Sequence, residues 1–282
     1  MQFFPGMSAL ADDYDGFILD LWGVIHDGVQ PYAGAADCLR RLRDAGKAAV
    51  MLSNAPRRVS VAQASLRGMG ISDDLYTGIM TSGEATHLLL RDRDDPWFAS
   101  LGRRVYHLGP ARDHNVFQDL DLELVSRPED ADFVLNTGPD DAGGATDLAD
   151  WEGLLQEFRR HNLKMICANP DLEVMRGPLR LICAGLLTQR YEALGGEARW
   201  IGKPDAAVYQ PVQQMLGVPK SRILAVGDTP RTDLAGAASV GIASCWVLGG
   251  IHAADFPNPD AAVAHARAAG FAPRALVQSF SW

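Results

Sequence analysis

The stretch Phe17-Ile18-Leu19-Asp20-Leu21-Trp22-Gly23-Val24 indicates the fold class of this chain. Its first three residues form a short apolar run that is typical of a buried strand, and the run leads directly into a carboxylate and a turn. A second run of this kind, 223–226, precedes Gly227-Asp228 far downstream. In parallel α/β sheets the ligand crevice lies outside the carboxyl ends of the strands, so acidic residues that follow different strands can meet there. We therefore expect Asp20 and Asp228 to converge at one edge of a parallel sheet.

Short apolar strands alternate with helix-like segments on both sides of this stretch, which is the signature of βαβ units. The expected strands are 17–21, 48–52, 78–80, 105–108, 133–135, 164–167 and 223–226. The expected helices are 33–44, 58–67, 84–90, 148–160 and a last one that starts after the N-cap Asn258, with Pro259 at N1, and stops near Gly270. A polar stretch at 91–96 and two glycines at 195–196 interrupt the pattern. The sequence thus predicts a discontinuous α/β core, 1–88 and 197–282, around an inserted α/β domain, 89–196.

Composition narrows the range of partners. The chain has 282 residues, of which 47% are hydrophobic, so it can fill a sizeable core. Its net charge of -9 argues against nucleic acid, because an acidic surface repels a phosphate backbone. The start has no basic n-region and no apolar run is long enough to span a bilayer, so we expect no membrane association and a cytoplasmic location. The widely spaced Cys38, Cys167, Cys183 and Cys245 are expected to be buried thiols in a reducing compartment.

Four short motifs together identify a family. They are Asp20-Leu21-Trp22-Gly23-Val24, Leu52-Ser53-Asn54, Gly202-Lys203-Pro204 and Gly227-Asp228, in this order. In this set and order the chain resembles the haloacid dehalogenase superfamily, and more narrowly its class IIA branch, which includes pyridoxal phosphate, phosphoglycolate, nitrophenyl phosphate and nucleotide phosphatases. The resemblance implies a Rossmann-like parallel-sheet core with an inserted α/β cap domain of the C2 type. It also implies Mg²⁺-dependent hydrolysis of a small phosphorylated metabolite.

The resemblance assigns the reacting groups. Asp20 matches the nucleophile, which would split hydrolysis into two displacements through an aspartyl-phosphate. Because an anion attacks a phosphate dianion, a cation must offset the repulsion, and Mg²⁺ prefers oxygen ligands. Asp20, the Trp22 main-chain carbonyl and Asp228 match the ligands, and Asp233 would act through water or orient its neighbours. An N-cap for the segment 234–238 is the alternative interpretation of Asp233. Lys203 would place its charge beside the phosphoryl oxygens and Asp20.

Other positions match the substrate-binding groups of the family. Ser53 matches the phosphate-binding hydroxyl, with the Asn54 backbone N–H as a second donor. Arg57 would hold the leaving-group side of the substrate or cap the following helix. Asn169, within Asn169-Pro170-Asp171, would face the leaving group or form a plain turn. Caps of this class often dimerise in relatives, which leaves a homodimer open.

Trp22 is a departure from the family pattern. Its phosphatases usually carry a second Asp two residues after the nucleophile, which protonates the leaving oxygen and then activates water; indole cannot do this. Three explanations stay open: His26 or Asp27 in the following loop stands in, the substrate supplies a good leaving group, or hydrolysis is lost. The competing hypothesis is therefore a protein that binds a phosphometabolite, or is itself phosphorylated at Asp20, without turnover.

Overall fold

The computed structural model describes residues 1–140, 147–176, 179–250, 253, 256 and 258–282. By packing, the chain divides into two compact units. The first unit is 1–53, 60–80 and 203–282, and the second is 54–59 and 81–202. The packing places 54–59 and the segment from residue 81 with the second unit, whereas the sequence pattern predicts a core that includes all of 1–88. The functional division into a core and a cap stays a prediction.

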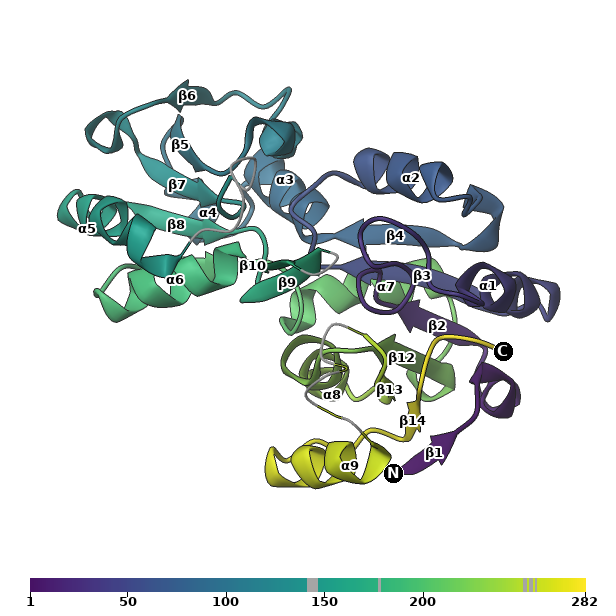
Figure 1. Cartoon of the computed structure of the whole chain (residues 1–282). Helices are drawn as coiled ribbons and strands as arrows, with labels where there is room; N and C mark the ends of the chain where they lie inside the picture. Colours follow the sequence, from purple (N-terminus) through teal and green to yellow (C-terminus); the bar gives the residue numbers. More distant parts are fainter. Residues whose placement is uncertain (141–146, 177–178, 251–252, 254–255, 257) are drawn as a thin grey trace. The chain divides into compact units, whose positions relative to one another are not determined.

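The first unit contains a seven-stranded sheet in the order β1-β14-β13-β12-β2-β3-β4 (Figure 1). Its strands are β1 (Gln2–Phe4), β2 (Gly16–Leu19), β3 (Ala48–Ser53), β4 (Gly78–Thr81), β12 (Ile223–Gly227), β13 (Ala243–Val247) and β14 (Ala275–Val277). The pairings from β1 through to β3 are parallel. From β2 the chain extends the sheet through β3 and β4 on one side, and it later extends the other side through β12 and β13. The order therefore reverses between β2 and β12, which is where open α/β sheets bind ligands.

Two helices of the first unit begin or end at residues that favour helix termini. The helices of this unit are α1 (Ala35–Asp44), most of α2 (Val59–Gly68), α7 (Tyr209–Leu216), α8 (Ala235–Ser239) and α9 (Pro259–Ala268). The Asn258 side chain accepts a hydrogen bond from the Ala261 N–H, and Pro259 occupies the first turn, as expected for an N-cap and N1 pair. Gly46, at φ +72°, follows α1 in the left-handed conformation that ends many helices. The predicted starts of α1 and α9 are confirmed to within two residues.

The second unit has a five-stranded sheet in the order β11-β8-β7-β5-β6, and its pairings are parallel. Its strands are β5 (Arg104–Leu108), β6 (Glu123–Val125), β7 (Phe133–Asn136), β8 (Lys164–Cys167) and β11 (Ala198–Trp200). A separate antiparallel hairpin consists of β9 (Glu173–Arg176) and β10 (Leu179–Ile182). The helices are α3 (Ser82–Asp92), α4 (Pro96–Ala99), α5 (Glu152–Arg160) and α6 (Ala184–Ala193). Apolar side chains cover both faces of this sheet, as a parallel sheet requires.

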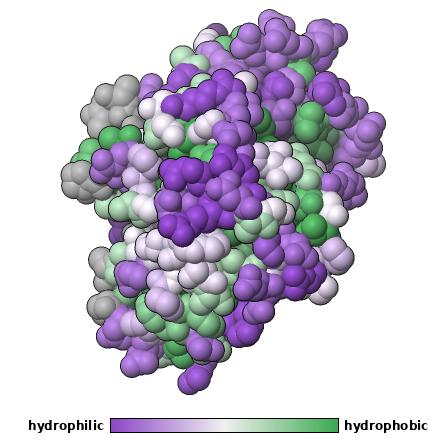
Figure 2. All heavy atoms as spheres, turned by 90° about the vertical axis from the view of Figure 1, so that its right-hand side faces the viewer, coloured by the Kyte–Doolittle hydropathy of each residue, from purple (hydrophilic) through white to green (hydrophobic). Residues whose placement is uncertain are grey.

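The predicted α/β fold with parallel sheets is confirmed, with local corrections. The helix predicted over 148–160 is α-helical only from Glu152, because Asp147 and Asp150 form a capping box around a 3₁₀ turn. All four cysteines are buried thiols, as predicted. Within the described part of the chain, no helix combines the length and the apolar character that crossing a bilayer requires. Hydrophilic residues predominate on the face seen in Figure 2.

Candidate active site

Three carboxylates meet at the carboxyl edge of the first unit's sheet. Asp20 follows β2 and Asp228 follows β12, and the Asp20 N–H donates to the Val226 carbonyl at 2.9 Å. Asp233 lies in the turn after Asp228, within a π-helical segment, Pro230–Leu234. One oxygen from each of the three carboxylates lies within 4.8 Å of the others. The convergence expected from strand ends is therefore present in the structure.

Lys203 lies between two of these carboxylates. Its Nζ is 2.7 Å from Asp20 Oδ1 and 2.7 Å from Asp233 Oδ1, and its side chain is only 3% exposed. Asp233 Oδ2 accepts from the Thr229 N–H at 3.1 Å. The alternative interpretation of Asp233 as an N-cap is wrong, because α8 has no side-chain cap and begins after Leu234. Asp233 instead fixes the ammonium group that faces Asp20.

The electrostatics of this cluster favour a cation. Burial raises the pKa of Asp20 well above its usual value, as do the negative charges of Asp233 and Asp228, while Lys203 opposes this shift. When all four groups are ionised, three carboxylates and one ammonium leave a formal charge of -2, which one divalent cation would balance. Oxygen donors are the ligands that Mg²⁺ and Ca²⁺ prefer. The donor set therefore fits a hard divalent metal, which would also favour the ionised form of Asp20.

Two glycines make room for the Asp228 carboxylate, and no function was predicted for either from the sequence. A Cβ on Gly23 would lie 2.1 Å from Asp228 Oδ2, and a Cβ on Gly250 would lie 2.2 Å from the same atom. Gly23 also has a φ of +90°, which favours glycine. The turn that contains Trp22 and Gly23 thus lies directly against Asp228. The Thr229 hydroxyl donates to Asp228 Oδ1 at 3.1 Å, and the buried Trp246 indole donates to the Asp228 carbonyl at 2.9 Å.

Known proteins share this organisation. A family model described as haloacid dehalogenase-like hydrolase matches residues 17–123, and a model described as HAD-hydrolase-like matches 200–280. A solved hydrolase of the haloacid dehalogenase-like family from Brucella suis 1330 is 35% identical, with a TM-score of 0.85 over 98% of this chain and 99% of that one. The chain belongs to the haloacid dehalogenase-like hydrolase family. The predicted family is thereby confirmed.

Two further relatives in this family are named as phosphatases. A 4-nitrophenylphosphatase from Thermotoga maritima is 26% identical, with a TM-score of 0.70 over 96% of each chain. A glycerol phosphate phosphatase from Mycobacterium tuberculosis, solved in complex with calcium, is 25% identical, with a TM-score of 0.63 over 86% of this chain and 68% of that one. The predicted enzyme class, a phosphatase of the haloacid dehalogenase type, agrees with these relatives.

The loop after Asp20 holds the residues considered as stand-ins for the missing acid. The Trp22 ring packs edge-on against His26 with ring centroids 5.5 Å apart, and a Cβ on Gly28 would lie 2.3 Å from the indole. His26 Nδ1 accepts from the Gly28 N–H at 3.0 Å, and burial lowers the pKa of His26 to about 4. Asp27 Oδ1 accepts from the N–H groups of residues 29 and 30 at 2.8 Å each, which lowers its pKa. Both side chains thus have local partners, and their stand-in function stays a prediction.

Ser53 is the last residue of β3 and is buried, so it ends the strand next to β2. Arg57 and Asn169 belong to the second unit. Arg57 Nε donates to the buried Asp113 at 3.2 Å. Arg57 does not cap α2: the first N–H groups there, on residues 58 and 59, donate to the side chains of Asn115 and Glu84. Asn169 Oδ1 accepts from the Asp171 N–H at 3.1 Å, so it closes a local turn. The substrate contacts predicted for these residues stay predictions.

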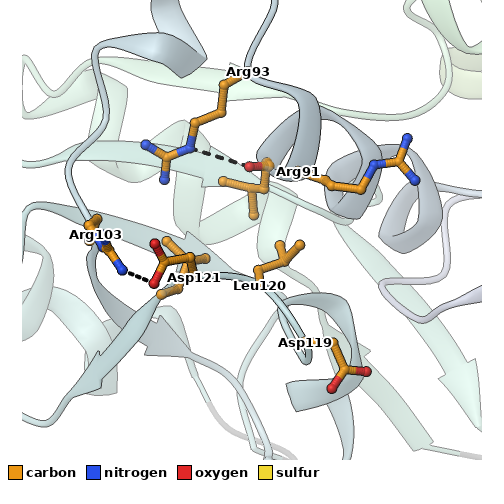
Figure 3. A pocket seen from close by; sticks show the side chains of 8 residues that line it. Arg91, Arg93, Arg103, Asp119, Leu120 and Asp121 are labelled. Carbon is orange, nitrogen blue, oxygen red and sulfur yellow. Dashed lines mark hydrogen bonds and ion pairs between the residues drawn. The ribbon is translucent and has the colours of Figure 1, made fainter.

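A surface pocket of about 370 Å³ lies in the second unit (Figure 3). Its lining residues include none of the acidic cluster. Its lining is Leu90, Arg91, Arg93, Arg103, Asp119, Leu120, Asp121 and Leu122. The arginines have protein partners: Arg93 donates to the carbonyls of residues 101 and 102, Arg103 pairs with Asp121, and Arg91 pairs with Asp92. We therefore assign no phosphate-binding function to this pocket.

Proposed function

We propose that this protein is a Mg²⁺-dependent phosphatase that hydrolyses a small phosphorylated metabolite through an aspartyl-phosphate on Asp20. The observation that carries the proposal is the meeting of Asp20, Asp228 and Asp233 within 4.8 Å, with Lys203 at 2.7 Å from Asp20. A protein that only needed a stable sheet edge would gain nothing from burying three carboxylates and an ammonium group together. Relatives that act on nitrophenyl phosphate and glycerol phosphate support the substrate class.

In the proposed reaction an Asp20 carboxylate oxygen forms a bond to phosphorus while the bond from phosphorus to the leaving oxygen breaks. Water then attacks the phosphorus of the acyl phosphate, which releases inorganic phosphate and restores Asp20. Lys203 stays beside Asp20 and stabilises the charge on the phosphoryl oxygens. Ser53 and the Asn54 backbone N–H would bind the phosphoryl group. The cation held by Asp20, the Trp22 carbonyl and Asp228, with Asp233 orienting Lys203, would supply charge neutralisation between two anions.

Leaving-group protonation limits the substrates that this site can cleave. Trp22 has no proton to transfer in the required manner, and His26 is neutral near pH 7 because its pKa is about 4. General acid–base catalysis contributes roughly 10²–10⁴-fold, so substrates whose leaving oxygen needs a proton suffer most. We infer that aryl and other activated phosphates are turned over faster than alkyl phosphates. The second unit would act as a cap that closes over the leaving group.

Asp20→Asn tests the proposal with a side chain of the same shape. We expect the release of nitrophenol from nitrophenyl phosphate to fall by roughly 10³-fold or more, and removal of Mg²⁺ from the wild type to abolish it. Asp15→Asn is the control, because Asp15 precedes β2 at the opposite edge of the sheet, where it pairs with Arg222 and Lys47. This control should retain wild-type turnover. Unchanged activity in Asp20→Asn would remove Asp20 from the mechanism.

A phosphometabolite-binding protein without turnover is the second candidate, and the observation that favours it is Trp22 itself. Its indole packs against His26 and the backbone at Gly28, and it cannot carry out the proton transfer of the usual aspartate. Binding of phosphorylated metabolites with no release of phosphate across a broad substrate panel would support this candidate. Release of phosphate that depends on Asp20 would exclude it. The homodimer and the cytoplasmic location stay predictions.

A further inference from the structure

The proposed phosphate site includes Ser53 and Lys203. Each of these residues is joined by a peptide bond to a residue of the second unit. Asn54 follows Ser53, and Gly202 precedes Lys203. The Asn54 side chain is buried, and both ends of its carboxamide have partners in the second unit. Its Nδ2 donates to Asp171 Oδ1 at 2.9 Å, and its Oδ1 accepts from the Ser82 hydroxyl at 3.3 Å. The carboxamide is therefore held in one orientation.

Gly202 packs against the same carboxamide. Its φ is +132°, and a Cβ at this position would lie 2.2 Å from Ser82 Oγ and 2.6 Å from Asn54 Oδ1. The chain that continues into Lys203 thus touches the side chain that follows Ser53. Any displacement of the Asn54 carboxamide would disturb both segments. The contact requires a glycine, which explains why this residue precedes Lys203.

Asp171 is itself held firmly by its surroundings. Its N–H donates to Asn169 Oδ1 at 3.1 Å, and a Cβ on Gly185, near the start of α6, would lie 2.5 Å from the Asp171 carbonyl and 2.5 Å from the Pro170 carbonyl. Asp171 follows the carboxyl end of β8 and is half-buried. A carboxylate that accepts from a buried amide makes a stronger bond than a neutral acceptor does. The charge-assisted hydrogen bond to the Asn54 side chain therefore comes from a residue that its surroundings in the second unit hold in place.

We propose that Asp171 is a positioning residue for phosphate binding. It acts through Asn54: by fixing the Asn54 carboxamide it fixes the orientation of the Asn54 backbone N–H and of the neighbouring Ser53 hydroxyl. This inference rests on the proposed function, because it concerns the same phosphate site. It differs from a direct contact between Asp171 and substrate, since a carboxylate would repel a phosphate dianion.

Three variants separate positioning from other effects. Asp171→Ala removes the acceptor for Asn54, whereas Asp171→Asn keeps an oxygen acceptor at the same place without the charge. Ser82→Ala removes the donor to the other end of the carboxamide. Asp132→Ala is the control, since Asp132 lies before β7, at the opposite end of the second unit's sheet, and accepts from two backbone N–H groups at 2.9 Å.

The measurements are KM and kcat for nitrophenyl phosphate, the dissociation constant of inorganic phosphate, and the melting temperature. We expect Asp171→Ala to raise KM and the phosphate dissociation constant about tenfold with a smaller change in kcat, because one charge-assisted hydrogen bond is lost. Ser82→Ala should change both in the same direction by less, and Asp171→Asn should restore most of the affinity. Asp132→Ala should lower the melting temperature as much as Asp171→Ala does, with unchanged phosphate affinity.

Wild-type phosphate affinity in Asp171→Ala would overturn the inference and leave the proposed function intact. So would an Asp171→Asn variant as weak as Asp171→Ala, because the charge rather than the position would then matter. If the wild type binds inorganic phosphate but hydrolyses nothing, the proposed hydrolysis fails, and the phosphate dissociation constants still decide whether Asp171 positions Asn54. A wild type that binds no phosphate would overturn both.

Discussion

Gly23→Ala should damage metal binding far more than it damages folding. The added Cβ would lie 2.1 Å from Asp228 Oδ2, a separation that real Cβ atoms essentially never show. The carboxylate must therefore retreat by roughly 1 Å, and a displacement of that size in a reacting site can cost about 10²-fold in rate. The left-handed φ of +90° adds a strain of about 1–2 kcal/mol. We expect a fall of about 10²-fold in kcat/KM for nitrophenyl phosphate and a higher Mg²⁺ concentration for half-activation.

Gly46→Ala is the matched control for this variant. Gly46 has a φ of +72° but nothing within 4 Å of an added Cβ, so it carries the strain without the clash. Urea denaturation should show the loss of stability due to backbone strain in both variants, with a further loss from the clash in Gly23→Ala, whereas only Gly23→Ala should lose activity. Gly250→Ala tests the clash without the strain. Its Cβ would lie 2.2 Å from Asp228 Oδ2, but its backbone conformation is outside the left-handed region. Equal activity in Gly23→Ala and Gly46→Ala would refute the metal-ligand function of Asp228.

Three further predictions concern single side chains. Lys203→Met should lower kcat by roughly 10²–10³-fold while Lys203→Arg keeps part of the activity; a Met variant near wild-type turnover would contradict the ion pairs with Asp20 and Asp233. His26, whose pKa of about 4 is below its unfolded value of 6.5, adds stability that is complete above pH 6.5 and is lost as the pH falls toward 4. From pH 7 to pH 5 the free energy of unfolding should fall by about 2 kcal/mol because of His26. Urea denaturation of His26→Gln should show a free energy of unfolding that depends less on pH. An equally steep dependence would count against the lowered pKa of His26. Trp22→Asp should raise the rate with alkyl phosphates relative to aryl phosphates; an unaltered ratio would indicate that another group already protonates the leaving oxygen.

The sequence predicted the acidic cluster because the rule behind it depends only on strand order. Asp20 and Asp228 each follow an apolar run, and the carboxyl ends of neighbouring parallel strands share one edge. The function of Lys203 was predicted from the family motif alone, because this residue does not follow a predicted strand and its segment has no regular pattern. Its position beside Asp20 was expected from the resemblance, but its contact with Asp233 was not predicted. That contact depends on the side-chain orientation of Asp233, which lies in a π-helical segment.

The supporting residues of the site could not be found from pattern. Gly23 and Gly250 matter because of where one Asp228 oxygen lies, and a sequence does not show that position. The glycine three residues after Asp20 and the Gly249-Gly250 pair after β13 were signals, but glycines in turns are common. The edge strand β1 and its neighbour β14 were missed for another reason. Each has three residues, too few to show a period, and they pair across almost the whole length of the chain.

The loop around Trp22 packs closely against the indole, so Trp22 contributes to the structure of the loop as well as replacing the usual aspartate. Gly28 has a φ of +89°, and any Cβ there would meet the indole at 2.3 Å, so the backbone approaches the ring as closely as it can. His26 packs against the same ring, and its Nδ1 accepts from the Gly28 N–H. An aspartate at position 22 would leave this space unfilled. The ring therefore fills the space beside the turn that brings Gly23 against Asp228, next to the proposed metal ligands.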